Sequence, residues 1–514
     1  MPPVYAFKPT PEQSAIIEAA VATRESLMVE ALAGCAKTTT LEHIAWAVPG
    51  KGPHLALAFN VKIKTELSRR LPESFEVKTL NGLGHNAFSK AIGKRLALDE
   101  GKLGRLIREV GKADGWDISG DLWAVLKDLV TLAMQRGLVP SDYPNKSLIP
   151  DSPESWQDLA LDAATTMVPE PVLALARKIL VAHIKEAFAG KISFDDQIYM
   201  SAMFNGVFPK HGLVMVDEAQ DLSPLNHIMV GKCLGPSSRL IVVGDPRQAI
   251  YAFRGADSQS MESMRRLRPT WRDLPLNTTF RCPKVIVQRQ LYHAPDFVAA
   301  SQAPEGQVLD WHQRPAWTLA DVAALPDLAI LCRNNGPLFS MAMRFLRHRQ
   351  PCVMLGRDIG KGLIALSKKL APDDDTPSEE VLKAIALWAG KEIANLKALG
   401  KEARIQSIED RSESLQAIAM ECPDAGSLRQ ALSELFSRDA GGITLATGHR
   451  SKGLEWTYVL ILDPWRIPSK YALRAEAEGD PRPMVQEANL RYVMETRSKA
   501  TLILADFKEF TVED

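Results

Sequence analysis

The sequence lacks several features that mark whole classes of proteins. Its six cysteines are scattered through 514 residues, without a Cys-x-x-Cys pair or a histidine cluster at metal-ligand spacing, so zinc and iron–sulfur sites are not expected. No apolar run approaches the roughly 18 residues of a membrane span, and residues 1–11 carry no charged-then-apolar signal. We therefore expect an intracellular protein of a reducing compartment, with no membrane partner.

An excess of charge is also missing, because 62 Lys and Arg residues balance 62 Asp and Glu residues. This balance argues mildly against a protein that coats nucleic acid, but not against one that confines its basic groups to a single groove. With 46% hydrophobic and 24% charged residues, the composition is that of ordinary soluble globular proteins. The length suggests about three or four domains or subdomains.

Short runs of Val, Ile and Leu alternate with segments of helical periodicity, which predicts the α/β class with parallel strands and crossover helices. The expected strands form two sets, and each set implies its own core. The first set is Ser26–Leu32, His54–Phe59, Gly212–Val216 and Arg239–Gly244, and the second is Leu328–Cys332, Ile443–Ala446, Tyr458–Leu462 and Thr501–Ala505.

Two stretches interrupt this alternation and are predicted to be mainly helical insertions, at residues 91–192 and 358–437. Within the second stretch, the segment beginning at Ser378 is a plausible helix start. The first core would then comprise residues 1–90 and 193–275. The second core would comprise residues 276–357 and 438–514.

A candidate phosphate loop follows the first apolar strand and precedes a helix-compatible segment. Its expected nucleotide-binding residues are Ala31, Leu32, Ala33, Gly34, Cys35, Ala36, Lys37, Thr38 and Thr39. Backbone N–H groups would cradle phosphates, Lys37 would reach the β and γ groups, and the Thr38 hydroxyl would hold Mg²⁺. Ala31 and Ala36 stand where the pattern G-x-x-x-x-G-K-[ST] has glycine, and the Cβ of Ala36 resists positive φ. Taken alone, the loop is equally compatible with a surface turn that carries a lysine.

Two carboxylates support the nucleotide interpretation. Asp217 and Glu218 directly follow an apolar strand, at the strand end where open α/β sheets bind ligands. Asp217 suits Mg²⁺, and Glu218 suits activation of a water molecule. An acidic helix N-terminus would explain the pair equally well in isolation. Together with Lys37 and Thr38, the pair predicts a site for ATP and Mg²⁺.

The order of further segments resembles the motif series of superfamily 1 DNA helicases, in the UvrD/Rep/PcrA-like group, over nearly the whole chain. The chain is also similar to the helicase part of F-box DNA helicases. The matching segments are Thr10–Gln13, Lys37–Thr38, Ala58–Asn60, Thr79–Gly84, Phe194–Asp196, Asp217–Gln220, Val243–Ala256, Leu276–Arg281, Thr447–Trp456 and Glu487–Arg497. The resemblance implies two RecA-like P-loop NTPase cores.

The resemblance also implies roles around ATP. Gln13 would read the adenine edge, Phe280 would stack on the base, and Glu455 would accept from the ribose hydroxyl. Gln248 would sense the γ-phosphate. Arg281 and Arg497 would stabilise charge in the transition state. Phe280 stands where the family usually has Tyr, which retains the stacking face.

For DNA, the resemblance points to nine residues: Phe59, Asn60, Thr79, Asn81, Tyr251, Phe253, Arg254, Thr447 and His449. Bases stack on aromatic rings whatever their sequence. The alternative for each aromatic residue is a place in the core or in a half-buried strand. Asn81 stands where the family has His, which weakens one expected contact.

These features predict an ATP-dependent DNA helicase that uses ATP and Mg²⁺ to move 3′→5′ along single-stranded DNA and to unwind duplexes. The expected partners are single strands and junctions between single and double strands, and the protein is expected to act as a monomer. A translocase that strips proteins from DNA without unwinding is an alternative. A nucleotide-gated DNA-binding protein with an impaired loop is a second alternative, motivated by Ala36.

Overall fold

The computed structural model describes residues 9–50, 52–58, 60–118, 120–163, 168–250, 257, 259–310, 318–399, 402–437 and 442–510. Contacts divide the chain into two compact units. Unit 1 consists of Met1–Ala31 and Ala36–Leu276, and unit 2 consists of Leu32–Cys35 and Asn277–Asp514.

Unit 1 is built on a six-stranded parallel sheet of order β3-β2-β6-β7-β1-β8. The strands are β1 Ser26–Ala31, β2 His54–Ala58, β3 Phe75–Thr79, β6 His211–Val216, β7 Leu234–Gly244 and β8 Trp271–Leu276. All five residues of β2 are buried, as expected for strands whose two faces are both covered. The four strands predicted for this core are confirmed. The prediction missed β3 and β8, which lie at the two edges of the sheet.

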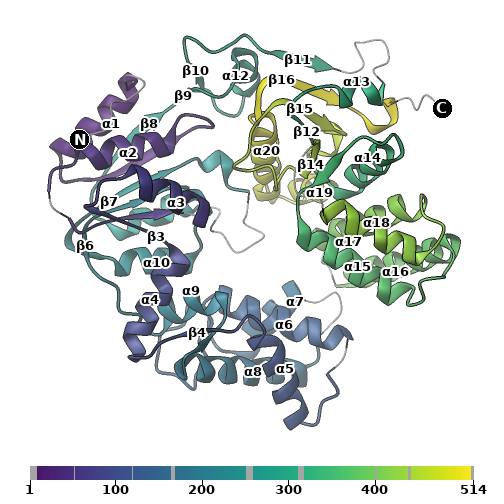
Figure 1. The fold of residues 1–514 in the computed structure, drawn as a ribbon. Coiled ribbons are helices and arrows are strands. Elements are labelled where there is room, and N and C mark those ends of the chain that lie inside the picture. Colours follow the sequence, from purple (N-terminus) through teal and green to yellow (C-terminus); the bar gives the residue numbers. More distant parts are fainter. Residues whose placement is uncertain are drawn as a thin grey trace. The chain divides into compact units, whose positions relative to one another are not determined.

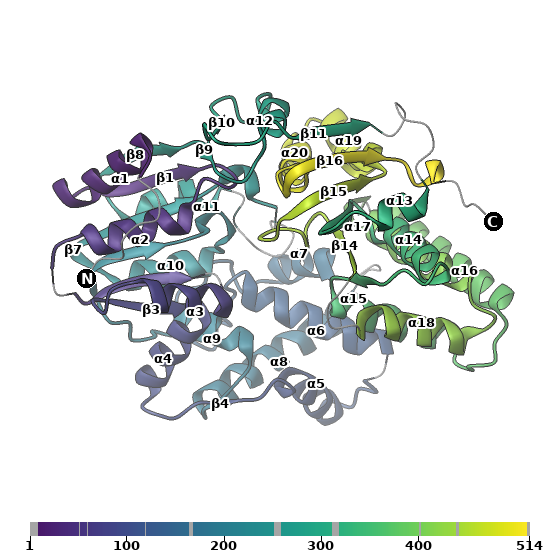
Figure 2. The ribbon, with the colours of Figure 1, turned by 45° about the horizontal axis from the view of Figure 1, so that its top comes forward.

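Helices cover this sheet and form the predicted insertion. The helices next to the sheet are α1 Pro11–Ala22, α2 Lys37–Ala47, α3 Val61–Arg70, α4 Leu80–Ile92, α9 Phe194–Met203, α10 Pro224–Lys232 and α11 Ser260–Met264. The insertion holds β4 Ala97–Leu98, α5 Lys102–Ala113, α6 Gly120–Gln135, α7 Pro153–Ala163, α8 Glu170–Phe188 and β5 Lys191–Ile192. Figures 1 and 2 show α5–α8 gathered at one end of unit 1, beyond α4 and α9. Leu55 of the sheet and Leu129 and Ile179 of the insertion belong to one continuous core.

Unit 2 contains a second six-stranded parallel sheet, of order β11-β16-β15-β12-β14-β13. Its strands are β11 Gln307–Asp310, β12 Leu328–Cys332, β13 Cys352–Met354, β14 Ile443–Thr447, β15 Trp456–Leu462 and β16 Ser498–Ala505. A separate two-stranded sheet pairs β9 Thr278–Thr279 with β10 Val298–Ala299. Two parallel α/β sheets confirm the predicted fold class.

The helices of unit 2 include a second insertion. Those near the sheet are α12 Lys284–Gln290, α13 Leu319–Ala323, α14 Asn335–Arg347, α19 Lys470–Ala477 and α20 Arg482–Glu495. The insertion consists of α15 Arg357–Leu370, α16 Ser378–Ala398, α17 Glu402–Ala419 and α18 Ala425–Ser437, which lie together beside α14 (Figure 2). The helix start predicted at Ser378 is confirmed.

Candidate nucleotide site and nucleic-acid interface

Three strands of unit 1 end at one edge of its sheet, and each leads into a segment with candidate site residues. β1 leads into the loop of residues 32–36, β6 into Asp217, and β7 into Asp245. The strands run parallel in the order β6-β7-β1, with Glu30 of β1 level with Gly244 of β7. Their carboxyl ends therefore lie side by side, at the edge where open α/β sheets bind ligands.

The loop between β1 and α2 adopts positive φ at Gly34 and Ala36, although alanine replaces both glycines of the phosphate-loop pattern, at Ala31 and Ala36. Ala36 lies in the left-handed region, with φ 56° and ψ 43°, and forms the N-cap of α2 without a side-chain hydrogen bond. We expected its Cβ to resist positive φ, and the structure places it there nonetheless, at a steric cost of roughly 1–2 kcal/mol. A helix N-terminus without a side-chain cap presents backbone N–H groups to an anion.

The structure brings Lys37, Thr38, Asp217 and Glu218 together within unit 1. The Thr38 hydroxyl donates to Asp217 Oδ2 at 3.0 Å, and Lys37 Nζ lies 3.8 Å from Glu218 Oε1. Burial raises the pKa of Asp217 to about 6 and the charge of Glu218 adds to this rise, while Lys37 and Thr38 oppose it. A nearby divalent cation would stabilise the ionised form of such a buried carboxylate. One hydroxyl and one carboxylate suit Mg²⁺, which takes its remaining ligands from phosphates and water.

Two residues that the sequence analysis did not single out connect these carboxylates to Gln248. The Gln220 amide donates to the Glu218 carboxylate, and Gln220 Oε1 accepts from the backbone N–H of Asp245 at 3.0 Å. The buried Asp245 accepts from Gln248 Nε2 at 2.8 Å. The sequence signal was available, because Asp245 follows an apolar strand just as Asp217 does. The network links the residue expected to sense phosphate to the residue expected to activate water.

Strained backbone occurs at Glu218, as it does at Ala36. Glu218 has φ 52° and ψ 41°, a left-handed conformation that residues with a Cβ rarely adopt. Strain of this kind clusters at functional sites, where the surrounding structure holds a side chain in a required direction. Here it turns the chain immediately after the buried Asp217.

The expected adenine reader, Gln13, lies at the start of α1. Its Oε1 accepts from the Thr10 backbone N–H at 3.0 Å, which completes a capping box, and its Nε2 donates to the Thr40 hydroxyl at 3.1 Å. Gln13 therefore joins α1 to the first turns of α2. Thr39 accepts from Arg70 Nη2 at 3.4 Å, and Arg70 also pairs with Glu42.

Three of the residues expected to contact DNA from unit 1 lie at or near helix N-termini. Asn60 caps α3 by accepting from the Ile63 backbone N–H at 2.9 Å, and Thr79 caps α4 in the same way. Asn81 Nδ2 donates to the carbonyl of Phe194 at 3.2 Å. Four further candidates lie outside the described residues: Phe59, Tyr251, Phe253 and Arg254.

In unit 2, the expected arginine and ribose residues meet each other. Arg281 Nε donates to Glu455 Oε2 at 2.6 Å, and the neighbouring Phe280 is 45% exposed. Arg497 is only 1% exposed and donates to the backbone carbonyls of Val493 and Leu454, at 2.8 and 3.2 Å. These carbonyl contacts hold its guanidinium between α20 and the segment that precedes β15.

Two further candidates in unit 2 lie at the end of β14. Thr447 is the last residue of that strand and is buried, and His449 lies two residues later in the following turn and is half-buried.

Comparison with known proteins matches two families to this chain. The family described as the UvrD/REP helicase N-terminal domain matches residues 178–268, and the UvrD-like helicase C-terminal domain matches residues 367–509. Both segments of the chain are therefore similar to UvrD-like helicases. The N-terminal match includes Asp217, Glu218 and Gln248, and the C-terminal match includes Glu455 and Arg497.

Relatives named as DNA helicases match over almost the whole length of this chain. F-box DNA helicase protein 1 of Schizosaccharomyces pombe is 26% identical over 97% of this chain and 57% of its own length. ATP-dependent DNA helicase UvrD2 of Mycobacterium tuberculosis is 25% identical over 95% of this chain and 77% of its own length. The chain thus spans little more than half of the first relative. Among the described residues, no helix is long and apolar enough to cross a membrane.

Proposed function

We propose that this chain is an ATP-dependent DNA helicase that hydrolyses ATP with Mg²⁺, moves 3′→5′ along single-stranded DNA and unwinds duplexes. The observation that carries the proposal is the meeting of Thr38 with Asp217, and of Lys37 with Glu218, at the carboxyl edge of the unit 1 sheet. The two matches to UvrD-like helicase domains and the relatives named as DNA helicases support the same activity. Single strands and junctions are the proposed partners, and a monomer inside the cell is the proposed working form.

The residues of unit 1 would have different roles in ATP hydrolysis. Thr38 Oγ1 and Asp217 Oδ2 would hold Mg²⁺, which supplies neutralisation of phosphate charge. Lys37 Nζ would move from Glu218 to phosphate oxygens. Glu218, released from that cation and still held by Gln220, would accept the proton of the attacking water. Gln248 would report the state of the phosphate through Asp245.

For unit 2 and the DNA, we propose the roles that the family resemblance implies. Phe280 and Glu455 would contact the adenosine, and Arg281 and Arg497 would stabilise transition-state charge. Arg281 gives only its Nε–H to Glu455 in this structure, so the N–H groups of its terminal nitrogens would act on phosphate while the two residues stay paired.

The first test measures ATP hydrolysis with and without single-stranded oligothymidine. We expect strong stimulation by DNA in the wild-type protein and loss of at least about 100-fold in Lys37→Ala, whose circular dichroism should remain native. Lys112→Ala, an exposed lysine of the insertion, is the matched control and should retain the rate. Absence of DNA-stimulated hydrolysis in the wild type would refute the motor and favour nucleotide-gated binding.

A second test separates helicase from translocase. Duplexes with a 3′ or a 5′ single-stranded tail are incubated with the protein and ATP, and strand displacement is followed. We expect displacement from the 3′-tailed duplex. Hydrolysis without displacement would favour a translocase that removes proteins, and displacement only from the 5′-tailed duplex would reverse the proposed direction.

A further inference from the structure

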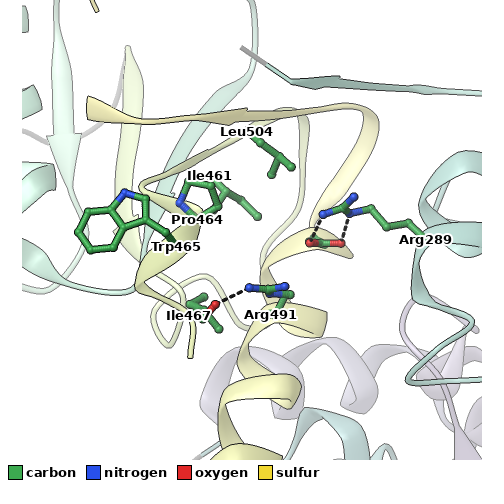
Figure 3. Close-up of a pocket in the computed structure, with 8 residues that line it drawn as sticks. Arg289, Ile461, Pro464, Trp465, Ile467, Arg491 and Leu504 are labelled. Atoms are coloured by element: carbon green, nitrogen blue, oxygen red, sulfur yellow. Dashed lines mark hydrogen bonds and ion pairs between the residues drawn. The ribbon is translucent and has the colours of Figure 1, made fainter. Parts of the chain in front are cut away.

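A pocket of about 220 Å³ opens on the surface of unit 2, and none of its lining residues is among those expected to bind nucleotide or DNA. Figure 3 shows the side chains that line it. They are Arg289 of α12, Ile461 of β15, Pro464, Trp465 and Ile467 of the turn after β15, Arg491 and Glu495 of α20, and Leu504 of β16.

The wall of the pocket is apolar and its rim carries exposed aromatic surface. Ile461 and Ile467 are 3% and 4% exposed, whereas Trp465 is 60% exposed. Among the described residues, no other tryptophan is exposed. A large aromatic side chain left in water beside a concave apolar surface is typical of a docking site. Among the described residues, the Arg466 guanidinium lies 4.9 Å from the centroid of the Trp465 ring, and the remaining exposed indole surface is available for apolar contact.

The charges of the pocket leave one cation without a carboxylate. Glu495 is 3% exposed, and its two oxygens accept from Arg289 Nε and Nη2 at 2.7 and 3.2 Å and from Gln290. Arg491 donates one N–H to the carbonyl of Ile467 and forms no ion pair with any described residue. Its guanidinium has five N–H groups, so donors remain for a ligand.

An exposed tyrosine that does not line the pocket lies near its charged residues. Tyr292, just beyond α12, is 65% exposed and lies close enough to Glu495, Arg491 and Arg289 to interact with each electrostatically. Trp, Tyr and Arg are the residues enriched at the energetic centres of protein–protein interfaces.

The size and charge of the pocket favour a peptide over a nucleic-acid strand. A volume of about 220 Å³ lies below the range of about 300–1,000 Å³ typical of small-molecule sites and suits one large side chain. A nucleic-acid strand carries a phosphate at every nucleotide and needs several cations in a row. The lining residues supply two arginines against one glutamate. A single carboxylate next to one apolar side chain matches this arrangement.

We propose that this pocket binds a peptide segment of a partner protein that inserts an aromatic or large aliphatic side chain against Trp465 and places a neighbouring Asp or Glu on Arg491. The segment would lie across the turn after β15, with its carboxylate paired to the guanidinium. This interaction requires neither ATP nor DNA. Its test therefore gives a result that does not depend on the proposed helicase activity.

The test uses a phage-displayed library of random 12-residue peptides, selected on the full chain without nucleotide or DNA. The most enriched peptide is labelled, and its dissociation constant is measured by fluorescence polarisation. Trp465→Ala and Arg491→Gln probe the pocket. Leu387→Ala, an exposed leucine of α16, and Arg482→Gln, an exposed arginine on the same helix as Arg491, are the matched controls.

We expect enriched peptides to carry Asp or Glu within two positions of an aromatic or large aliphatic residue. Trp465→Ala and Arg491→Gln should each weaken binding at least tenfold, and the controls should leave it unchanged. Replacing the peptide carboxylate by its amide should weaken binding several-fold, which tests the charge pairing even if Arg491→Gln fails to fold.

Three results would overturn the proposal. The first is selection that enriches no peptide, or enriches peptides that bind both pocket variants as well as the wild type. The second is displacement of the peptide by single-stranded oligothymidine, which would assign the pocket to nucleic acid. The third is self-association of the chain through the pocket, seen as a dimer in sedimentation that Trp465→Ala abolishes.

Discussion

A buried ion pair joins the helical insertion of unit 1 to α9, and its removal provides a sharp test of the packing. Lys102 Nζ of α5 lies 2.7 Å from Asp196 Oδ2 of α9, and both side chains are 0% exposed. The same carboxylate lies 2.9 Å from His183 Nε2 of α8 and accepts from the Ser193 backbone N–H at 2.7 Å. Asp196 therefore holds two helices of the insertion and the N-terminus of its own helix.

Asp196→Asn removes the charge and almost preserves the shape, but it leaves the Lys102 ammonium buried without its anion. We expect unit 1 to lose about 3–5 kcal/mol of stability. Burial lowers the pKa of Lys102, and Asp196 only partly offsets this effect. Replacing Lys102 as well removes the unpaired buried charge. The double variant Lys102→Met, Asp196→Asn should therefore recover about half or more of the stability that Asp196→Asn loses.

Acid should reveal the same interaction. Burial alone would raise the pKa of Asp196, but His183 and Lys102 lower it from 3.8 to about 2. Because the folded pKa lies below the unfolded value, the ionised carboxylate stabilises the fold above about pH 4. That contribution, roughly 2.5 kcal/mol, should disappear as the pH falls from about 4 to 2. Asp196→Asn should lack this part of the acid-induced loss.

Urea unfolding followed by circular dichroism, at pH 7 and at acid pH, measures these differences. The matched control is Asp162→Asn, which breaks an ion pair with Arg136 in the same insertion whose side chains are 53% and 52% exposed. Its effect should stay below about 1 kcal/mol. The reasoning fails if Asp196→Asn costs less than about 1 kcal/mol, or if the double variant is no more stable than Asp196→Asn.

Three further changes test the nucleotide site. Ala36→Gly should relieve left-handed strain and raise stability by about 0.5–1 kcal/mol without weakening ATP binding; a lower unfolding midpoint would contradict the strain at this residue. Glu218→Gln should reduce hydrolysis at least about 100-fold while equilibrium binding of a fluorescent ATP analogue persists, and full activity would remove Glu218 from the proposed chemistry. Gln13→Ala loses the bond to Thr40 and the capping box, so it should lower the free energy of unfolding by about 1–2 kcal/mol, measured by urea titration; an unchanged midpoint would show that these bonds contribute nothing.

Which strands the sequence revealed depended on their burial. The central strands read as continuous apolar runs because helices cover both faces, and β12 was predicted with its observed bounds, Leu328–Cys332. The edge strands β8 and β11 were missed because solvent reaches them: β8 is buried only at Leu276, and β11 has no buried residue. The edge strand β13 was missed because it is only 3 residues long, although Cys352 and Met354 are buried. Their register depends on pairing with a neighbouring strand, which no local pattern specifies.

For the candidate site too, some features were predictable from the sequence and others depended on the tertiary structure. The sequence by itself predicted Lys37, Thr38, Asp217 and Glu218 as candidates, because these residue types directly after apolar strands are typical of a phosphate site. Only the tertiary structure decided that Ala36 would adopt positive φ, because the energy of the surrounding fold offsets a local steric cost.

Partners that are distant in sequence were likewise a matter of tertiary structure. Gln220 bonds to Asp245, and Arg281 bonds to Glu455, because the sheets bring together strand ends and turns separated by tens to hundreds of residues. The sequence therefore fixes which groups are available for chemistry, and packing selects which of them meet.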